Sequence, residues 1–436
     1  MPGHYLEQNT TITLKKNSGQ IRCNIYRHKD VNRSPILVNY GPYGKDIQYK
    51  EPAPGVLDIA SRATSEVFVD DVDWAAQRSW SMEVGLLGIS YYAGGQWRVA
   101  SSQPKGLACM IPWGLIQITT VTGVAMKAIL PNTFIKWWWD RQVIGNQYER
   151  TGRAGDLSEK GLLANHNDQI IDNVKNRLRD EPYYASREYN MEHIQVPLLS
   201  YLRFITGRHD LPFYYHEEVE LQRSFLDAFL WGEDRAGWST GNVGFDNAKA
   251  ERFFLTLDFR LQTQAPQSGL VKHIYRADGG YWPHRRSSLN VFVCPDEGGP
   301  LSSETDLFLT LRYVSPSGEE IYYTSTVGDP TPLTKGWTRV SMRKVNEKHL
   351  RHREYLPYRD YYSTGVLPVM PGEVYPVDVE IWLSNVVVEK GGTQASEIFR
   401  HNYPTDRSAE KLQGENHIHF RPVYENYVTL PLISSL

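Results

Sequence analysis

Residues 84–94 read Val84-Gly85-Leu86-Leu87-Gly88-Ile89-Ser90-Tyr91-Tyr92-Ala93-Gly94, and the interpretation of the whole chain starts from them. An apolar run typical of a buried strand ends at Ile89, and a serine follows before a helical pattern begins. A serine on a tight strand-to-helix turn needs small neighbours such as Gly88. The stretch therefore predicts a nucleophile elbow, in which the Tyr91 N–H lies at a helix N-terminus and can face a developing oxyanion.

The motif differs from the usual elbow in one position. It reads Gly-x-Ser-x-Tyr-Ala, whereas most elbows read Gly-x-Ser-x-Gly. The same residues also fit an ordinary turn between a strand and a helix, in which the serine has no catalytic role. This stretch alone leaves both interpretations open, so the rest of the chain must decide between them.

Length and composition limit the possible classes of protein. The chain has 436 residues and a formal net charge of −3, and this length favours two domains. Because there is no long basic run, we expect neither nucleic acid nor an anionic membrane as a partner, and no apolar run approaches the ~20 residues of a membrane span. Cys23, Cys109 and Cys294 lack the spacing of a metal site or a disulfide framework. We expect a cytoplasmic protein.

The first half of the chain alternates strand and helix patterns. Apolar runs bounded by turn residues predict strands, and the spacing of Val69, Val72, Trp74 and Ala76 predicts a helix. This order is typical of an α/β domain built around a parallel sheet. The predicted strands are residues 21–28, 34–40, 84–89, 107–112, 194–200 and 201–206, and the predicted helices are residues 65–77, 94–100 and 217–232.

Two further segments complete the expected architecture. Residues 130–190 are rich in helix formers, and we interpret them as a helical cap whose tryptophans form its core or line a ligand cleft. From about residue 240, short alternating runs between turns predict an all-β sandwich or jelly roll. We expect an α/β domain at 1–238, with a cap insertion at 113–190, and a β-sandwich domain at 239–436. The alternating runs are residues 289–293, 307–314, 320–325, 338–342 and 377–382.

Several longer stretches occur in an order that points to one family. They are Tyr40-Gly41-Pro42-Tyr43-Gly44-Lys45, Trp74-Ala75-Ala76, the elbow, residues 221–230, Glu304-Thr305-Asp306-Leu307-Phe308, residues 336–341 and Pro371-Gly372-Glu373-Val374-Tyr375. With these stretches the chain resembles the serine hydrolase family that includes X-Pro dipeptidyl-peptidases, cocaine esterase and related acylases. The resemblance implies an α/β-hydrolase sheet with a helical cap, followed by a galactose-binding-like jelly roll.

The resemblance also implies roles for four residues. Ser90 corresponds to the nucleophile, and His209, just beyond a late predicted strand, corresponds to the general base. Tyr43 falls where the family has a tyrosine whose hydroxyl forms the oxyanion hole with the N–H of Tyr91. The alternatives are a surface-loop histidine at 209 and simple turn packing at 43. No metal or organic cofactor is implied; the expected substrate is a small ester or amide or a short peptide, and a homo-oligomer is compatible with the sequence.

The chain departs from the family pattern, and in two of these places we expect internal deletions. No Asp or Glu lies between Ile194 and His209, where the triad acid is expected, and Asp210 is a poor substitute because neighbours in an extended chain point in opposite directions. The triad acid is therefore unknown, with Asp168 or Asp172 of the cap conceivable. The passage between Lys50 and Pro54 is also too short for the sheet strand that the family has there.

These observations give two hypotheses for function. The first is a serine acyl hydrolase that cleaves an ester, amide or X-Pro peptide bond through an acyl-enzyme on Ser90. The alternative is a catalytically impaired pseudoenzyme or a binding module, because the triad-acid loop and one strand are missing. Carbohydrate binding would rest only on the likeness of the C-terminal module, and a sandwich fold says little about its ligand. An acid within reach of His209 would favour the enzyme.

Overall fold

The structure of the chain, a computed structural model, describes most of both halves and parts of the segment between them. Its described residues are 3–15, 19–41, 60–113, 129, 138–139, 160, 172, 175–176, 178–199, 211–240, 305–324, 329–350, 352–353, 356–381, 418–419 and 425–429, together with the backbone of the strands named below.

A parallel sheet forms the centre of the N-terminal half. Its strands lie in the order β3 (Ser34–Val38), β4 (Ser81–Ile89) and β5 (Leu107–Trp113). Residues 197–199 extend it beyond β5, because Met110 N donates to Pro197 O and Leu199 N donates to Met110 O, each at 3.0 Å. The predicted strand at 194–200 is thus confirmed at its centre, whereas the one predicted at 201–206 lies outside the described residues.

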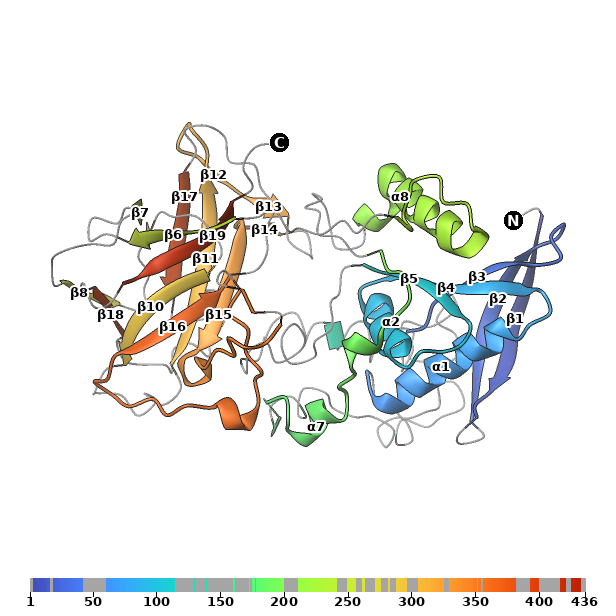
Figure 1. Cartoon of the computed structure of the whole chain (residues 1–436), viewed down its shortest axis with the longest axis horizontal. Helices are drawn as coiled ribbons and strands as arrows, with labels where there is room; N and C mark the ends of the chain where they lie inside the picture. Colours follow the sequence, from blue (N-terminus) through green and yellow to red (C-terminus); the bar gives the residue numbers. More distant parts are fainter. Residues whose placement is uncertain are drawn as a thin grey trace.

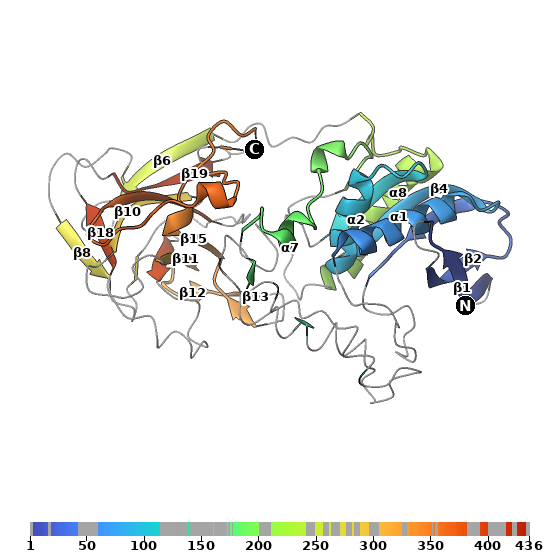
Figure 2. The ribbon, with the colours of Figure 1, turned by 90° about the horizontal axis from the view of Figure 1, so that it is seen from below.

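Helices cover both faces of this sheet (Figures 1 and 2). α1 (Arg62–Ala76) and α2 (Tyr91–Ser101) pack on one face, and α8 (His216–Leu226) with the π-helical turn η4 (Asp227–Trp231) packs on the other. Because successive strand residues point to opposite faces, Met110 joins the first core and Cys109 joins the second. Helices on both faces of a parallel sheet confirm the α/β class expected from the sequence.

A β-hairpin precedes the sheet, and its loop is bonded to α1. Its strands are β1 (His4–Thr13) and β2 (Gln20–His28), which pair antiparallel. Lys15, just after β1, makes salt bridges with Asp70 and Asp73 of α1. The guanidinium of Arg27 lies 5.1 Å from the ring centroid of Trp80, which precedes β4. The sequence predicted β2 but not β1.

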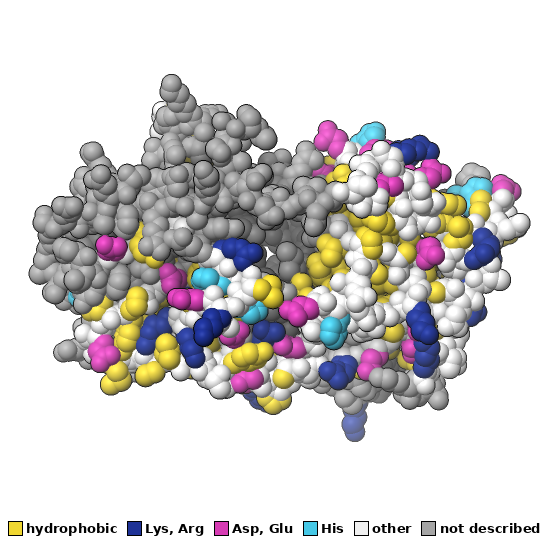
Figure 3. Space-filling model, in the orientation of Figure 1, with side chains coloured by type: hydrophobic (Ala, Val, Ile, Leu, Met, Phe, Trp, Pro, Cys, Tyr) yellow, Lys and Arg dark blue, Asp and Glu magenta, His cyan; other side chains and the backbone are white. Residues whose placement is uncertain are grey.

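The outer edge of β3 is unpaired within the described part of the chain. There β3 pairs only with β4, and β1 and β2 form a sheet of their own. Leu37 of β3 is 47% exposed, and hydrophobic side chains gather near α8 in Figure 3. The predicted loss of a strand concerns residues 50–54, which lie outside the described residues, so it stays a prediction.

The C-terminal half contains two larger antiparallel sheets and a short hairpin. The first sheet has the order β7-β6-β19-β10-β18-β8, with β16 also pairing with β10; the second has the order β12-β11-β17-β9, with β15 also pairing with β11, and β13 pairs with β14. The strands are β6 (Lys249–Leu255), β7 (Leu261–Gln262), β8 (Val271–Tyr275), β9 (Tyr281–Trp282), β10 (Ser288–Pro295), β11 (Asp306–Val314), β12 (Glu320–Ile321), β13 (Tyr323–Thr324), β14 (Pro330–Thr331), β15 (Thr334–Arg339), β16 (Tyr375–Glu380), β17 (Thr393–Phe399), β18 (Asn416–Phe420) and β19 (Tyr427–Leu432).

Alternating burial gives each of these sheets one apolar face. Leu307 and Leu309 of β11 are buried, as are Val377 and Val379 of β16. This pattern is that of a β-sandwich and agrees with the expected all-β module. The strand predicted at 338–342 is wrong at its C-terminal end, because β15 ends at Arg339 and residues 340–342 form the 3-10 turn η6 (Val340–Met342).

The two halves meet at a described contact beside α7 (Pro182–Ala185). The Asp180 carboxylate accepts hydrogen bonds from the backbone N–H of Ser363, at 2.8 Å, and from its hydroxyl. Next to it, the backbone N–H of Arg179 donates to the carbonyl of Tyr361 at 2.9 Å. The end of the predicted cap is therefore bonded to a loop of the β-sandwich. The domain boundaries expected from the sequence stay predictions.

Candidate active site

Ser90 lies on a strained turn between β4 and α2. Its φ of 62° and ψ of −125° place a non-glycine residue in the left-handed half of backbone space. The backbone around it holds this conformation: Ser90 N donates to Trp113 O, and Ala93 N and Gly94 N both donate to Ser90 O, each at 2.9 Å. The Ser90 side chain makes no capping hydrogen bond with α2. Strain of this kind persists where surrounding contacts enforce it, and it clusters at functional sites.

Two glycines allow the turn to close around Tyr92. A Cβ placed on Gly88 would lie 2.6 Å from the Cβ of Tyr92, and one placed on Gly41 would lie 2.6 Å from its Cε1. Real Cβ atoms do not come this close to other atoms, so a side chain at either position would displace Tyr92. The unusual tyrosine of the Gly-x-Ser-x-Tyr motif thus fits because its ring lies against two residues that have no side chain.

Tyr91 is anchored by its side chain at the first position of α2. Its hydroxyl accepts a hydrogen bond from Ala60 N at 2.9 Å, and its ring stacks on Trp138 at a centroid distance of 6.2 Å. The first N–H groups of a helix have no acceptor within the helix, and they carry its partial positive charge. The backbone N–H of Tyr91 is thus a suitable donor to an oxygen that becomes negative beside Ser90. One of the cap tryptophans predicted to form a core or line a cleft stacks on this elbow.

The predicted residues Tyr43 and His209 lie outside the described residues, but described neighbours of both contact the elbow region. Gly41, two residues before Tyr43, contacts Tyr92 as described above. Phe213, four residues after His209, packs edge-on against Trp113 at 5.5 Å between ring centroids. The carbonyl of Trp113 is the one that accepts from Ser90 N. Gly41 and Phe213 themselves therefore lie close to the turn that carries Ser90.

The acid of the predicted triad is not identified by the described residues. Asp168 lies outside them. The backbone carbonyl of Asp172 accepts hydrogen bonds from the backbone N–H and the side-chain amide of Asn176, and these bonds do not involve the carboxylate of Asp172. Two buried acids, Asp71 of α1 and Glu218 of α8, were not predicted from the sequence; they are 8% and 2% exposed. The signal for Asp71 was its place beside Val72 on the buried face of α1.

Burial changes the titration of charged groups behind the elbow. Desolvation raises the pKa of Asp71 to about 7. Desolvation likewise lowers the pKa of Arg98, a buried residue of α2, while the nearby hydroxyls of Tyr91 and Tyr189 oppose this shift. Among the described residues, no group of three or more His, Cys, Asp or Glu side chains is arranged to hold a metal ion. Within the same residues, every helix is too short or too polar to cross a bilayer.

Comparison with known families gives two matches, one in each half of the chain. Residues 52–219 match the X-Pro dipeptidyl-peptidase (S15 family). Residues 286–429 match the X-Pro dipeptidyl-peptidase C-terminal non-catalytic domain. No curated protein sequence matches the chain significantly.

Solved structures share the fold over nearly the whole chain. A CocE/NonD family hydrolase from Staphylococcus aureus aligns with a TM-score of 0.81 at 18% identity, covering 98% of this chain and 94% of that one. An alpha-amino acid ester hydrolase aligns with a TM-score of 0.65 at 11% identity. An aminopeptidase from a marine-sediment Thaumarchaeota archaeon aligns with a TM-score of 0.63 at 10% identity. Both alignments cover 98% of this chain and 96% of the other. At these identities the likeness shows a common fold.

Proposed function

This chain belongs to the X-Pro dipeptidyl-peptidase/cocaine esterase family of serine hydrolases, and we propose that it cleaves an ester, amide or peptide bond through an acyl-enzyme on Ser90. The observation that carries this proposal is the strained backbone of Ser90 between β4 and α2. A serine without catalytic work could occupy this junction with an ordinary turn, so the strain supports a nucleophile.

In the proposed reaction, the Ser90 hydroxyl oxygen attacks the carbonyl carbon of the substrate. His209 accepts the hydroxyl proton and passes it to the leaving alcohol or amine as the acyl-enzyme forms. The carbonyl oxygen, negative in the tetrahedral intermediate, is stabilised by the N–H of Tyr91 and the hydroxyl of Tyr43. Water then attacks the acyl-enzyme with the same base, which releases the carboxylic acid and restores Ser90.

The breadth of the substrate class follows from the family and its structural relatives. The names of the similar proteins include an aminopeptidase and an alpha-amino acid ester hydrolase, which supports small esters, amides or short peptides as substrates. We further propose that residues 239–436 form a galactose-binding-like jelly roll that covers one side of the hydrolase. No cofactor takes part in the proposed reaction, and a cytoplasmic location and a homo-oligomeric state stay predictions from the sequence.

One observation favours the alternative of an impaired enzyme or a binding module. Within the described residues, β3 has no partner on its outer edge, and the β1–β2 hairpin is a separate sheet. The residues where the missing strand and the missing acid loop are predicted lie outside that part of the chain. A hydrolase lacking its triad acid would keep the elbow but lose about 10⁴-fold in turnover.

Pre-steady-state kinetics with a p-nitrophenyl ester of a short acid tests the proposal. We expect a burst of p-nitrophenol equal to the enzyme concentration, followed by slower turnover, because the acyl-enzyme accumulates. Ser90→Ala should lose the burst and at least about a thousandfold in turnover. Ser102→Ala, at the other end of α2, is the matched control and should keep both. A folded wild-type protein without burst or turnover would instead support the impaired alternative.

A further inference from the structure

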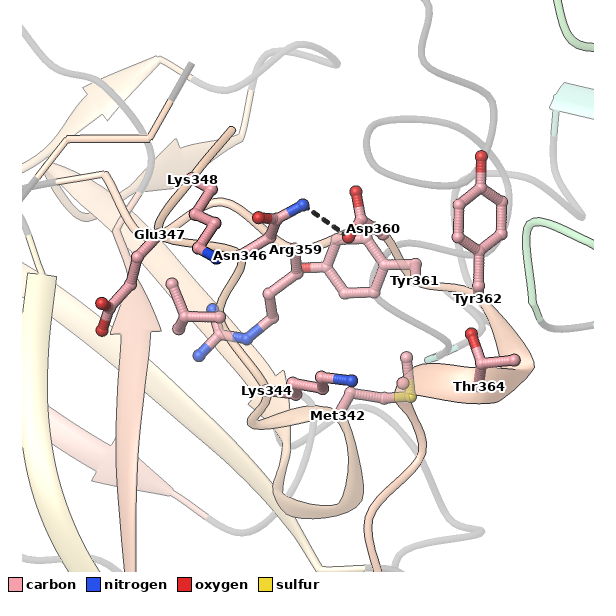
Figure 4. Close-up of a pocket in the computed structure, with 12 residues that line it drawn as sticks. Met342, Lys344, Asn346, Glu347, Lys348, Arg359, Asp360, Tyr361, Tyr362 and Thr364 are labelled. Carbon is pink, nitrogen blue, oxygen red and sulfur yellow. Dashed lines mark hydrogen bonds between the residues drawn. The ribbon is translucent and has the colours of Figure 1, made fainter. Parts of the chain in front are cut away.

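A cavity lies in the β-sandwich half, between the end of η6 and the loop of residues 359–365, away from Ser90. Its volume is about 450 Å³, which falls within the usual range of small-molecule sites. Residues 342–348 form one part of its wall and residues 359–365 form the other (Figure 4). These residues take no part in the proposed reaction.

A buried arginine lines this cavity without a counter-ion. Arg359 is 3% exposed, and its Nη2 donates to the carbonyl of Asp378 on β16 at 2.5 Å. Its Nε and Nη1 are buried and have no hydrogen-bond partner. Within the described residues no carboxylate forms a salt bridge with it. A buried charge without a partner is unfavourable, and the penalty disappears when an anion pairs with it.

A second buried donor lies beside the guanidinium. Tyr361 is 4% exposed, and its hydroxyl has no hydrogen-bond partner. Burial raises the pKa of Tyr361; the positive charge of Arg359 and its contact with the hydroxyl oppose this rise, whereas the carboxylate of Glu380 adds to it, so the three groups are close in space. Tyr361 also has a φ of 56°, a strained value for a tyrosine. Both unsatisfied groups can donate to the same acceptor.

The rest of the lining adds positive charge and apolar surface. Lys344 and Lys348 are exposed at the rim, and neither forms a salt bridge with a described residue. Two carboxylates are also present: Asp360 accepts a hydrogen bond from the amide of Asn346 at 2.9 Å, and Glu347 is directed away from the other side chains in Figure 4. The apolar part of the wall comes from Met342, Val345 and the tyrosine rings.

We propose that this cavity binds a small organic carboxylate, with the carboxylate toward Arg359 and Tyr361 and its apolar body against Met342 and Tyr362. The free nitrogens of Arg359 are screened from solvent, so the guanidinium must rotate toward the cavity when the anion enters. The site is independent of Ser90 and does not depend on the proposed hydrolase activity. The competing explanation is that Arg359 only braces β16 through Asp378.

Titration calorimetry with 4-bromobenzoate tests the proposal, and the bromine locates the ligand by anomalous diffraction in a soaked crystal. We expect the neutral 4-bromobenzamide to bind at least about tenfold more weakly, because it cannot neutralise Arg359. Arg359→Gln should weaken the binding of 4-bromobenzoate at least about tenfold, and Lys344→Gln should weaken it about threefold. Lys105→Gln, an exposed lysine of the other half, is the matched control and should change nothing.

Several outcomes would overturn the proposal. They are an absence of 4-bromobenzoate binding, equal binding of the amide, a bromine site beside Ser90 or on the surface, and an unchanged affinity of Lys344→Gln. Tighter binding of inorganic phosphate than of the carboxylate would overturn the assigned ligand class. If Arg359→Gln does not fold, the position of the bromine and the Lys344→Gln affinity still decide the question.

Discussion

A Cβ built on Gly88 would lie 2.6 Å from the Cβ of Tyr92, so these two residues can be neighbours only because one of them has no side chain. The contact spans the turn that carries Ser90 and fixes its shape. We therefore predict that Gly88→Ala lowers esterase turnover by about 10- to 100-fold and stability by about 1–3 kcal/mol, since the added methyl must push Tyr92 away.

The double variant Gly88→Ala, Tyr92→Gly tests the cause of this loss. It should recover much of the lost stability, because the clash disappears with the tyrosine side chain. Gly365→Ala is the control, since a Cβ there meets nothing within 4 Å. A Gly88→Ala protein with unchanged turnover and melting temperature would contradict the account of the elbow.

The buried carboxyl of Asp71 predicts an unusual pH dependence of stability. Burial raises its pKa in the folded protein to about 7, whereas aspartate in an unfolded chain titrates near pH 4. Between these values the folded state binds a proton that the unfolded state has lost, so this group makes folding less favourable as pH rises from about 4 to 7. Its full contribution is at most about 4 kcal/mol.

Urea unfolding of wild type and Asp71→Asn across this pH range checks the prediction. The variant should lack the decline that Asp71 causes and should be the more stable protein at pH 7 and above. Asp30→Asn, whose side chain is 84% exposed, serves as the control and should keep the wild-type profile. Parallel profiles for wild type and Asp71→Asn would show that Asp71 ionises normally.

The salt bridge between Asp306 and Arg339 joins two strands of the β-sandwich. Arg339 Nε and Nη2 donate to the two carboxylate oxygens at 2.8 and 3.0 Å, and both side chains are mostly buried. Asp306→Asn should cost about 3 kcal/mol of unfolding free energy, because it removes the negative charge that faces a mostly buried guanidinium. Glu220→Gln, which breaks an exposed pair with Arg223, should cost no more than about 0.5 kcal/mol. Equal costs for the two variants would refute this ranking.

The hydrogen bonds between Asp180 and Ser363 should couple the two halves of the chain. Although burial opposes the effect, the bonds from Ser363 hold the pKa of Asp180 below its ordinary value, so the contact is made while the carboxylate is ionised. Asp180→Ala should increase hydrogen exchange both at residues 178–189 and near residue 363. Asp234→Ala removes a similar but local set of bonds to Ser239 and should affect its own loop only. Faster exchange at residues 178–189 alone would speak against coupling.

Local sequence patterns predicted the strand and the helix that position the elbow. The features that these patterns did not predict depend on contacts between distant segments. The apolar run ending at Ile89 and the periodicity of Val69 and Val72 correctly indicated β4 and α1. β1 was missed because its side chains are mostly polar and exposed, with Ile12 alone of its residues buried. The π-helical turn after α8 was also missed, although Gly232, with a φ of 75°, correctly marked where the predicted helix ends.

The burial of some charged groups could not be predicted from the sequence for a related reason. Arg359 looks like an ordinary surface residue in its local sequence, and only packing against distant segments removes it from water. The contact between Asp180 and Ser363 joins residues 183 positions apart, a separation that no local pattern indicates. The tyrosine of the unusual elbow motif, Tyr92, is explained by the structure, in which Gly41 beyond the end of β3 lies against its ring.

Labelling with a fluorophosphonate probe, followed by digestion and mass spectrometry, tests the central claim most directly. If Ser90 is an activated nucleophile, the folded protein should carry one phosphonyl group on the peptide that contains Ser90. Ser90→Ala should then remain unlabelled, and Ser102→Ala should be labelled like the wild type. A folded protein that stays unlabelled, or one labelled at another serine, would contradict the proposed role of Ser90.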